Sequence, residues 1–139
     1  MIFDINSVVL ELKGLRLSLP KAQVLPSDKL LDAYEKELGF IFPDDYRYFL
    51  KEASDSILNG KDSLRVTPGK DSPRELINNA NEAWGLGVPR DWLPFCEDNG
   101  NYYCLTKCGE VRFWSHDGLS DESWPNLATW IKKVWIDEE

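Results

Sequence analysis

YEKELGFIFPDDYRYFL, residues 34–50, contains the end of one helix and the beginning of the next. Gly39 stands where a helix C-terminus favours a residue that tolerates positive φ, and Pro43 stands where a helix can start without an N–H. Asp44 and Asp45 fall in the first turn of the second helix, where carboxylates complement the positive end of the helix dipole. Apolar residues on both sides repeat at helical spacing, which predicts two amphipathic helices joined by a short apolar bridge.

The same stretch resembles the signature of the SUKH superfamily, which includes bacterial immunity proteins against secreted toxins and a fungal cell-wall assembly regulator. That signature is an acid, Leu-Gly, an apolar segment, Pro, an acid, Tyr, a basic residue and an aromatic-Leu pair. Its positions in this sequence are Glu37, Leu38, Gly39, Phe40, Pro43, Asp44 or Asp45, Tyr46, Arg47, Phe49 and Leu50. The family usually has Leu before the proline, where this chain has Phe42.

Later segments carry the resemblance through most of the chain. Residues 86–95 are similar to the family's approach to its sheet, and residues 98–103 to its acidic-Gly-Asn-aromatic hairpin. Gly109 and Val111, with Trp114, match a Gly-x-Val strand that ends in Trp and polar residues. The resemblance therefore implies structural roles for these three residues. An acid that the family often has at the end of the middle strand is absent here.

Composition limits the partner classes. The 139 residues predict a single domain, residues 1–139, and six Trp, six Phe and five Tyr supply apolar area for a core. The net charge is −8 and the pI about 4.7. This acidity argues against nucleic acid or an anionic membrane as the partner and favours a neutral or basic one. A second interpretation is that the acidity only keeps the protein soluble.

The predicted compartment is the cytoplasm. The N-terminus lacks a basic start, Asp4 interrupts its apolar residues, and no apolar run approaches the roughly 20 residues that span a bilayer. Three cysteines, an odd number without a C-x-x-C pair, are typical of a reduced protein.

The N-terminal half of the chain predicts mostly helices. Residues 1–26 fit either a short helix, with Asn6 as cap and Gly14 as stop, or a hairpin around Gly14, and the resemblance favours the helix. A helix capped by Ser27 ends at Leu38, and a second one runs from Pro43 to about residue 53.

The middle of the chain predicts a strand and another helix. Residues 54–63 are expected to form a polar loop, and residues 64–66 a short strand. Ser72 and Glu75 have the spacing of a capping box with Pro73 in the first turn, which predicts a helix start there. Gly85 and Gly87 are expected to end this helix.

The C-terminal part predicts a three-stranded antiparallel meander, with strands at residues 93–98, 101–107 and 111–116, followed by a helix from about residue 125 to 135. Asn99-Gly100 is a strong hairpin signal. The order of elements predicts an α+β fold with helices packed on an antiparallel sheet.

Neither a catalytic centre nor a metal site is predicted, and no cofactor is expected. His116 is the one histidine, and its neighbours Ser115 and Asp117 would point to the opposite face of a strand. A two-residue hairpin loop places Cys96 and Cys104 on opposite faces of the sheet, so they can share neither a metal nor a disulfide.

The resemblance implies a non-catalytic immunity protein that binds a toxin domain. Acidity points to a cationic toxin such as a nuclease. The chain is expected to act as a monomer or weak dimer. Candidate toxin contacts are the acids of the meander and its loops, with one aromatic anchor: Asp91, Glu97, Asp98, Asp117, Asp121, Glu122 and Trp124. The second interpretation is a regulatory, scaffolding or ligand-sensing module related to the fungal proteins.

Overall fold

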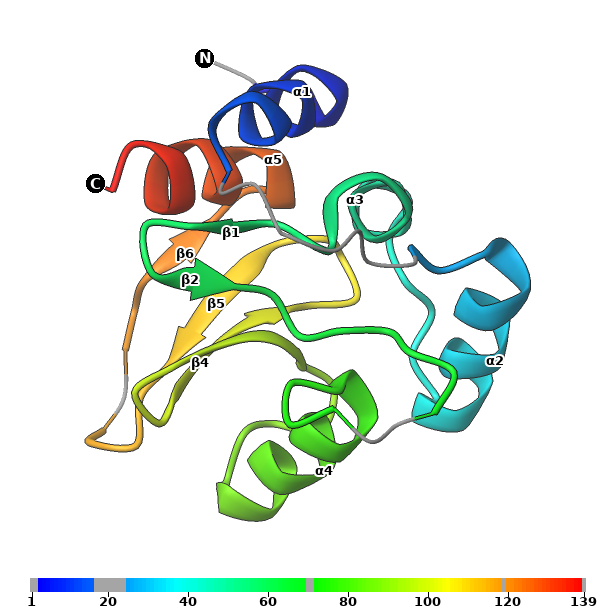
Figure 1. The fold of residues 1–139 in the computed structure, drawn as a ribbon. Coiled ribbons are helices and arrows are strands. Elements are labelled where there is room, and N and C mark those ends of the chain that lie inside the picture. Colours follow the sequence, from blue (N-terminus) through cyan, green and yellow to red (C-terminus); the bar gives the residue numbers. More distant parts are fainter. Residues whose placement is uncertain (1–2, 17–24, 70–71, 119, 139) are drawn as a thin grey trace.

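Helices and antiparallel strands follow one another along the chain in the computed structural model of the protein, which describes residues 3–16, 25–69, 72–118 and 120–138 (Figure 1). The helices are α1 (Ile5–Leu15), α2 (Asp28–Leu38), α3 (Asp44–Ala53), α4 (Leu76–Leu86), α5 (Leu127–Trp130) and the π-helix η1 (Ile131–Ile136). The strands are β1 (Ile57–Leu58), β2 (Lys61–Asp62), β3 (Leu93–Asp98), β4 (Asn101–Leu105), β5 (Val111–Trp114) and β6 (Ser123–Trp124).

The main sheet has four antiparallel strands in the order β3-β4-β5-β6. Asp98 pairs with Asn101 across the Asn99-Gly100 turn, as the hairpin signal predicts. The register shifts between Pro94 and Cys96, and Pro94 lies opposite Cys104. The α+β class is confirmed, but the meander is extended by β6, whose two residues are too few to give a period in the sequence.

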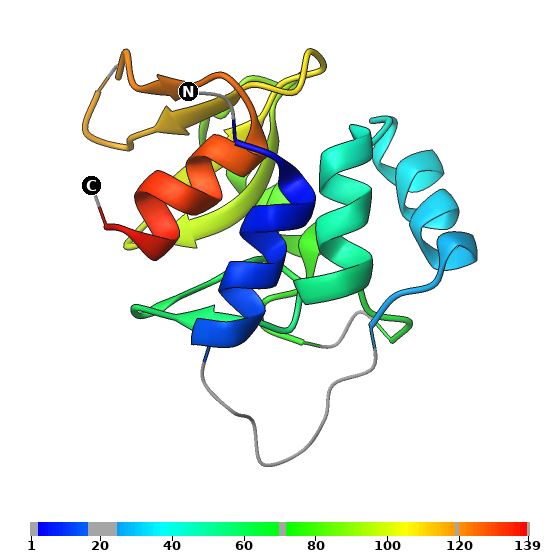
Figure 2. The ribbon, with the colours of Figure 1, turned by 90° about the horizontal axis from the view of Figure 1, so that it is seen from above.

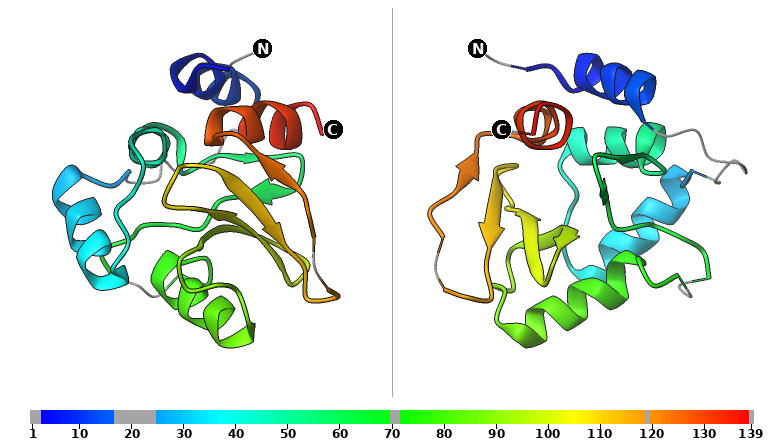
Figure 3. Two further views of the ribbon diagram at one scale, coloured as in Figure 1. Left: turned by 180° about the vertical axis from the view of Figure 1, so that it is seen from behind. Right: turned by 60° about the vertical axis from the view of Figure 1, so that its left-hand side comes forward.

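Two layers of helices enclose this sheet. Figure 2 shows α1 lying between α5 and α3, and Figure 3 shows these helices on one side of the sheet and α4 on the other. The main core lies between the sheet and the layer formed by α1, α3 and α5. It contains Trp130 and Trp135, each 1% exposed. The predicted C-terminal helix is present, but it widens from α into π geometry after Trp130.

The corner between α2 and α3 follows the local sequence closely. Gly39 ends α2 in the left-handed conformation with φ 69°, and Ser27 caps the start of α2. Pro43 is the residue immediately before α3. Tyr46, Phe49 and Leu50 are at most 1% exposed and Leu38 is 4% exposed, so the apolar signature residues form core.

Charged groups close this corner. The guanidinium of Arg47 lies 3.0 Å from Asp28, 3.1 Å from Asp32 and 3.2 Å from Glu35. The backbone N–H of Phe42 donates to Glu35 Oε2 at 2.6 Å. Glu35 therefore binds both the bridge between the helices and Arg47.

The N-terminal segment is a helix, so the hairpin interpretation is wrong. Asp4, rather than the predicted Asn6, caps α1 by accepting a hydrogen bond from Ser7 N. Gly14 lies inside the helix. The remainder of the first 26 residues falls partly in positions 17–24, which lie outside the described residues.

The segment between α3 and α4 differs from the prediction. The expected polar loop contains the β1–β2 hairpin around Asn59-Gly60, and the expected strand is reduced to a single bridge between Arg65 and Glu75. Asn59 donates to the carbonyl oxygen of Trp135 at 2.8 Å, and Trp135 Nε1 donates to that of Leu58 at 3.0 Å. These contacts with η1 fix a hairpin that is too short to be recognised by periodicity.

Helix α4 begins at Leu76, so the predicted capping box at Ser72 is wrong. Glu75 is the N-cap itself, and its buried carboxylate accepts hydrogen bonds from Ile77 N and Asn78 N at 2.9 and 2.8 Å. The hydroxyl of Tyr34 donates to the same carboxylate. Tertiary contact with α2 thus moves the helix start beyond the locally favoured position.

Candidate protein-binding surface

A second apolar cluster lies on the side of the sheet that α4 covers. Four buried residues form its base, and three half-buried tryptophans lie around them: Ala83, Val88, Tyr102 and Cys104, with Trp84, Trp92 and Trp114. We call this group the outer cluster. Trp114 is therefore neither a fully buried core residue nor a freely exposed one.

A pocket of about 330 Å³ opens beside the outer cluster. Trp92 and Trp114 contribute its aromatic walls, with Gly87, Pro89 and His116 among the other lining residues. We call it the outer pocket. Its volume is within the range that proteins use to enclose a small ligand or a side chain.

Local contacts hold the tryptophans of this cluster in place. Trp84 Nε1 donates to the carbonyl oxygen of Trp92 at 2.9 Å. The guanidinium carbon of Arg90 lies 3.7 Å from the centre of the Trp84 ring, a cation–π contact. The rings of Tyr102 and Trp114 are 6.0 Å apart and tilted by 44°.

Four of the predicted contact residues are exposed. Asp91 directly precedes Trp92, and Asp117, Asp121 and Glu122 lie in or beside the β5–β6 connection. Asp98 is half-buried at the β3–β4 turn.

The β3–β4 turn meets the β5–β6 connection at His116. Asn101 Oδ1 lies 2.7 Å from His116 Nδ1 and accepts the backbone N–H of His116 at 3.1 Å. The acids of the turn and of the connection therefore share one end of the sheet.

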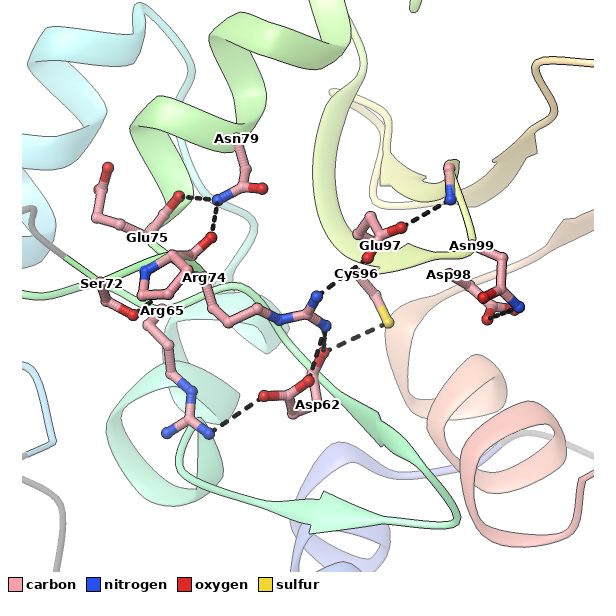
Figure 4. A network of polar contacts seen from close by, with 12 residues as sticks. Asp62, Arg65, Ser72, Arg74, Glu75, Asn79, Cys96, Glu97, Asp98 and Asn99 are labelled. Carbon is pink, nitrogen blue, oxygen red and sulfur yellow. Dashed lines mark hydrogen bonds and ion pairs between the residues drawn. The ribbon is translucent and has the colours of Figure 1, made fainter.

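The carboxylate of Glu97 is bound by other groups of the protein itself. Figure 4 shows its carboxylate between Arg74 and the β3–β4 turn: Oε1 lies 3.0 Å from Arg74 Nη1, and Oε2 accepts the backbone N–H of Gly100 at 2.7 Å. Arg74 also binds Asp62 at 2.7 Å. A change at Glu97 would thus disturb the join between β2, β3 and the start of α4.

Trp124 is half-buried in β6. Its ring lies 5.8 Å from that of Tyr103 and contacts the main core. The structure places its ring on the opposite side of the sheet from the outer cluster, against the inner core.

Several residues of this surface are not identified by sequence reasoning. Trp92, Pro89 and Gly87 belong to the segment that resembles the family's approach to the sheet, but their spacing does not reveal a pocket. The local pattern around Arg74 indicates only a capping box. Register and helix placement bring these residues together, and neither is visible in a local pattern.

His116 contacts its neighbour Asp117 as well as Asn101. The prediction that Asp117 points away from it is wrong: Asp117 Oδ1 lies 3.4 Å from His116 Nε2, because β5 ends at Trp114 and both residues lie in a turn. Both ring nitrogens thus face oxygen atoms. A general base would instead need one nitrogen directed at a nucleophile.

Two of the three cysteines are buried. Cys96 and Cys104 are buried in the main core and the outer cluster respectively, on opposite sides of the sheet as predicted. Burial raises the pKa of Cys96 to about 12 and also raises that of Cys104. Within the described ranges, no three His, Cys, Asp or Glu side chains gather in a group that could hold a metal ion.

Across the part of the chain that the structure describes, the helices are too short or too polar to cross a membrane.

Comparisons with known proteins identify the family. The model of the family SUKH_5, described as "SMI1-KNR4 cell-wall", matches residues 5–136. A solved structure, the "Crystal structure of protein from Pseudomonas syringae pv. tomato", is similar with a TM-score of 0.87 and 30% sequence identity, over 95% of this chain and 98% of that chain. No curated protein gives a significant match. The chain therefore belongs to the SUKH_5 (SMI1-KNR4) family of the SUKH superfamily.

Proposed function

We propose that this protein is a non-catalytic immunity protein that binds and neutralises a cognate toxin domain in the cytoplasm. Family membership supports a role in protein–protein interaction. The observation that carries the proposal is the set of exposed acids at one end of the sheet, Asp117, Asp121 and Glu122, in a chain of net charge −8.

The acids support a particular class of toxin as the target. A nuclease must carry positive charge to hold phosphate groups, and an acidic inhibitor that covers this charge competes with the nucleic acid. Complementary charge also accelerates encounter between the two proteins. We therefore propose a secreted or contact-dependent nuclease domain as the target, bound by one copy of this chain.

Co-expression tests the proposal. The chain is produced together with the C-terminal domain encoded by its upstream neighbouring gene, and cell survival and co-purification are measured. Survival with a stable complex is the expected result. Death of the cells without a complex would contradict the immunity role.

Charge reversal then tests the acidic surface. We expect Asp121→Lys and Asp117→Lys to slow association and to reduce its dependence on salt, because each removes an attraction that ions screen. Glu138→Lys makes the same charge change at the C-terminus and is the control. Glu97→Lys is a poor probe, since it would also break the Arg74 contacts.

A second candidate is a regulatory or scaffolding module. The observation that favours it is the family description, "SMI1-KNR4 cell-wall". Two results would support this function against immunity: a housekeeping gene neighbourhood, and no improvement in cell survival when this chain is co-expressed with the neighbouring domain.

A further inference from the structure

We propose that the outer pocket receives one aromatic side chain of the partner, projected from a basic surface. The inference rests on the proposed function and deepens it by stating what the toxin domain presents. It assigns the anchor of the interface to Trp92 and Trp114 rather than to Trp124.

The shape of the pocket supports a single large anchor. Its volume of about 330 Å³ exceeds what one small side chain fills. The two indole rings offer flat faces, on which an aromatic ring stacks favourably. Interfaces concentrate their binding energy in such desolvated aromatic anchors.

The pocket is preorganised. Gly87 ends α4 with φ 121°, and a Cβ at this position would lie 3.7 Å from Cζ2 of Trp114, so the chain turns closely past that ring. The Trp84–Trp92 hydrogen bond holds the next segment, and the contact with Asn101 holds His116. A formed pocket loses less conformational entropy on binding.

The charges beside the pocket select a basic surface around the anchor. Asp91 adjoins the lining residue Trp92, and Asp117 adjoins the lining residue His116; both acids are exposed. Arg90 is the basic residue nearest to Trp92 in sequence, and its guanidinium is occupied over the ring of Trp84.

Two other hollows fit such an anchor less well. The pocket at the α2–α3 bridge has one exposed apolar side chain, Ile41, beside the opposite charges of Asp44 and Lys107. The charged residues Asp62, Arg65 and Arg74, which line the pocket near β2, are joined to one another by ion pairs.

Peptide titration tests the proposal directly. The ¹⁵N-labelled protein is titrated with unlabelled acetyl-KKWKK-amide, acetyl-KKAKK-amide and acetyl-EEWEE-amide while the indole N–H signals of its tryptophans are followed. We expect the first peptide to shift the Trp92 and Trp114 signals and to bind about tenfold or more tightly than the other two. Equal binding of the first two peptides would show attraction by charge only and would overturn the proposal.

Variants assign the binding to the pocket. Trp114→Ala removes one wall, and Pro89→Phe places a ring at the exposed rim, so both should reduce binding of acetyl-KKWKK-amide about tenfold or more. Ile41→Ala, at the distant bridge, should leave binding unchanged. The indole signals outside the outer cluster report whether each variant is folded, and undiminished binding by folded Pro89→Phe would overturn the proposal.

Toxin binding separates the two proposals. If wild type and Pro89→Phe protect cells and bind the neighbouring domain equally well, the immunity role stands and the anchor assignment fails. If wild type neither protects nor binds, the proposed function fails, whatever the peptides do.

Discussion

The two sides of the four-stranded sheet use the same residue type in opposite ways. On the inner side Trp130 and Trp135 are each 1% exposed and contact each other with ring centres 5.8 Å apart. On the outer side Trp92 and Trp114 are half-buried and line a pocket. Helices α1, α3 and α5 lie over the inner side and α4 lies over the outer side (Figure 3). The inner tryptophans are thus enclosed in the main core, while the outer ones keep part of their surface exposed.

The largest difference between the sides is expected in stability. Trp130→Ala should lower the free energy of unfolding by about 3–5 kcal/mol, because it leaves a large cavity in the main core. Trp114→Ala should cost less than about 2 kcal/mol, since part of the ring already contacts water. Chemical denaturation of both variants measures this, and equal losses would contradict the distinction between the sides.

Glu75 provides the next largest effect, because this N-cap joins α4, the helix of the outer side, to Tyr34 of α2. Glu75→Gln should lower the free energy of unfolding by about 1–3 kcal/mol, since an amide cannot accept all the hydrogen bonds that the buried carboxylate receives. Glu82→Gln, exposed on the same helix, is the control and should change stability by less than about 0.5 kcal/mol. Thermal unfolding compares them, and similar melting temperatures would argue against this role of Glu75.

A smaller effect is expected at alkaline pH. Burial, with the nearby charge of Asp98, raises the pKa of Tyr103 from 10.0 to about 12. As pH rises, the unfolded chain therefore loses the Tyr103 proton before the folded protein does. The contribution of Tyr103 to stability is complete below pH 10 and is lost as pH rises to about 12. Screening by solvent limits the loss to about 1 kcal/mol.

Tyr103→Phe isolates this contribution. The variant should lose less stability than wild type over the same pH interval, as measured by denaturation at a series of pH values. Tyr48→Phe, the same chemical change on α3, is the control. Parallel curves for wild type and Tyr103→Phe would rule out the Tyr103 contribution.

Thiol labelling should show the smallest difference, one of rate rather than stability. In Cys108→Ser protein, which lacks the exposed thiol, Cys104 on the outer side should react faster than Cys96 on the inner side, because a single helix covers it. Mass spectrometry after pulses of a thiol reagent measures both rates. Faster labelling of Cys96 would mean that the inner side opens first.

Local sequence predicts the parts of this fold that depend on neighbouring residues. Gly39 ends one helix because it tolerates positive φ, Ser27 caps that helix, and Asn99-Gly100 sets the pairing at the turn of the β3–β4 hairpin. These signals act over a few residues, which explains why the α2–α3 corner and the β3–β4 turn follow the prediction. The start of α4 does not, because a tertiary hydrogen bond between Tyr34 and Glu75 outweighs the capping box at Ser72.

The candidate surface shows the same division. Sequence alone determined the acidity, the exposed acids Asp117, Asp121 and Glu122, and the signature by which the family can be identified. Tertiary packing, by contrast, brings Arg74 to Glu97, places Trp124 against the inner core, and makes Trp92 and Trp114 line one pocket. Charge and helix periodicity are properties of a segment, whereas a pocket exists only where strand register and helix packing bring distant segments together.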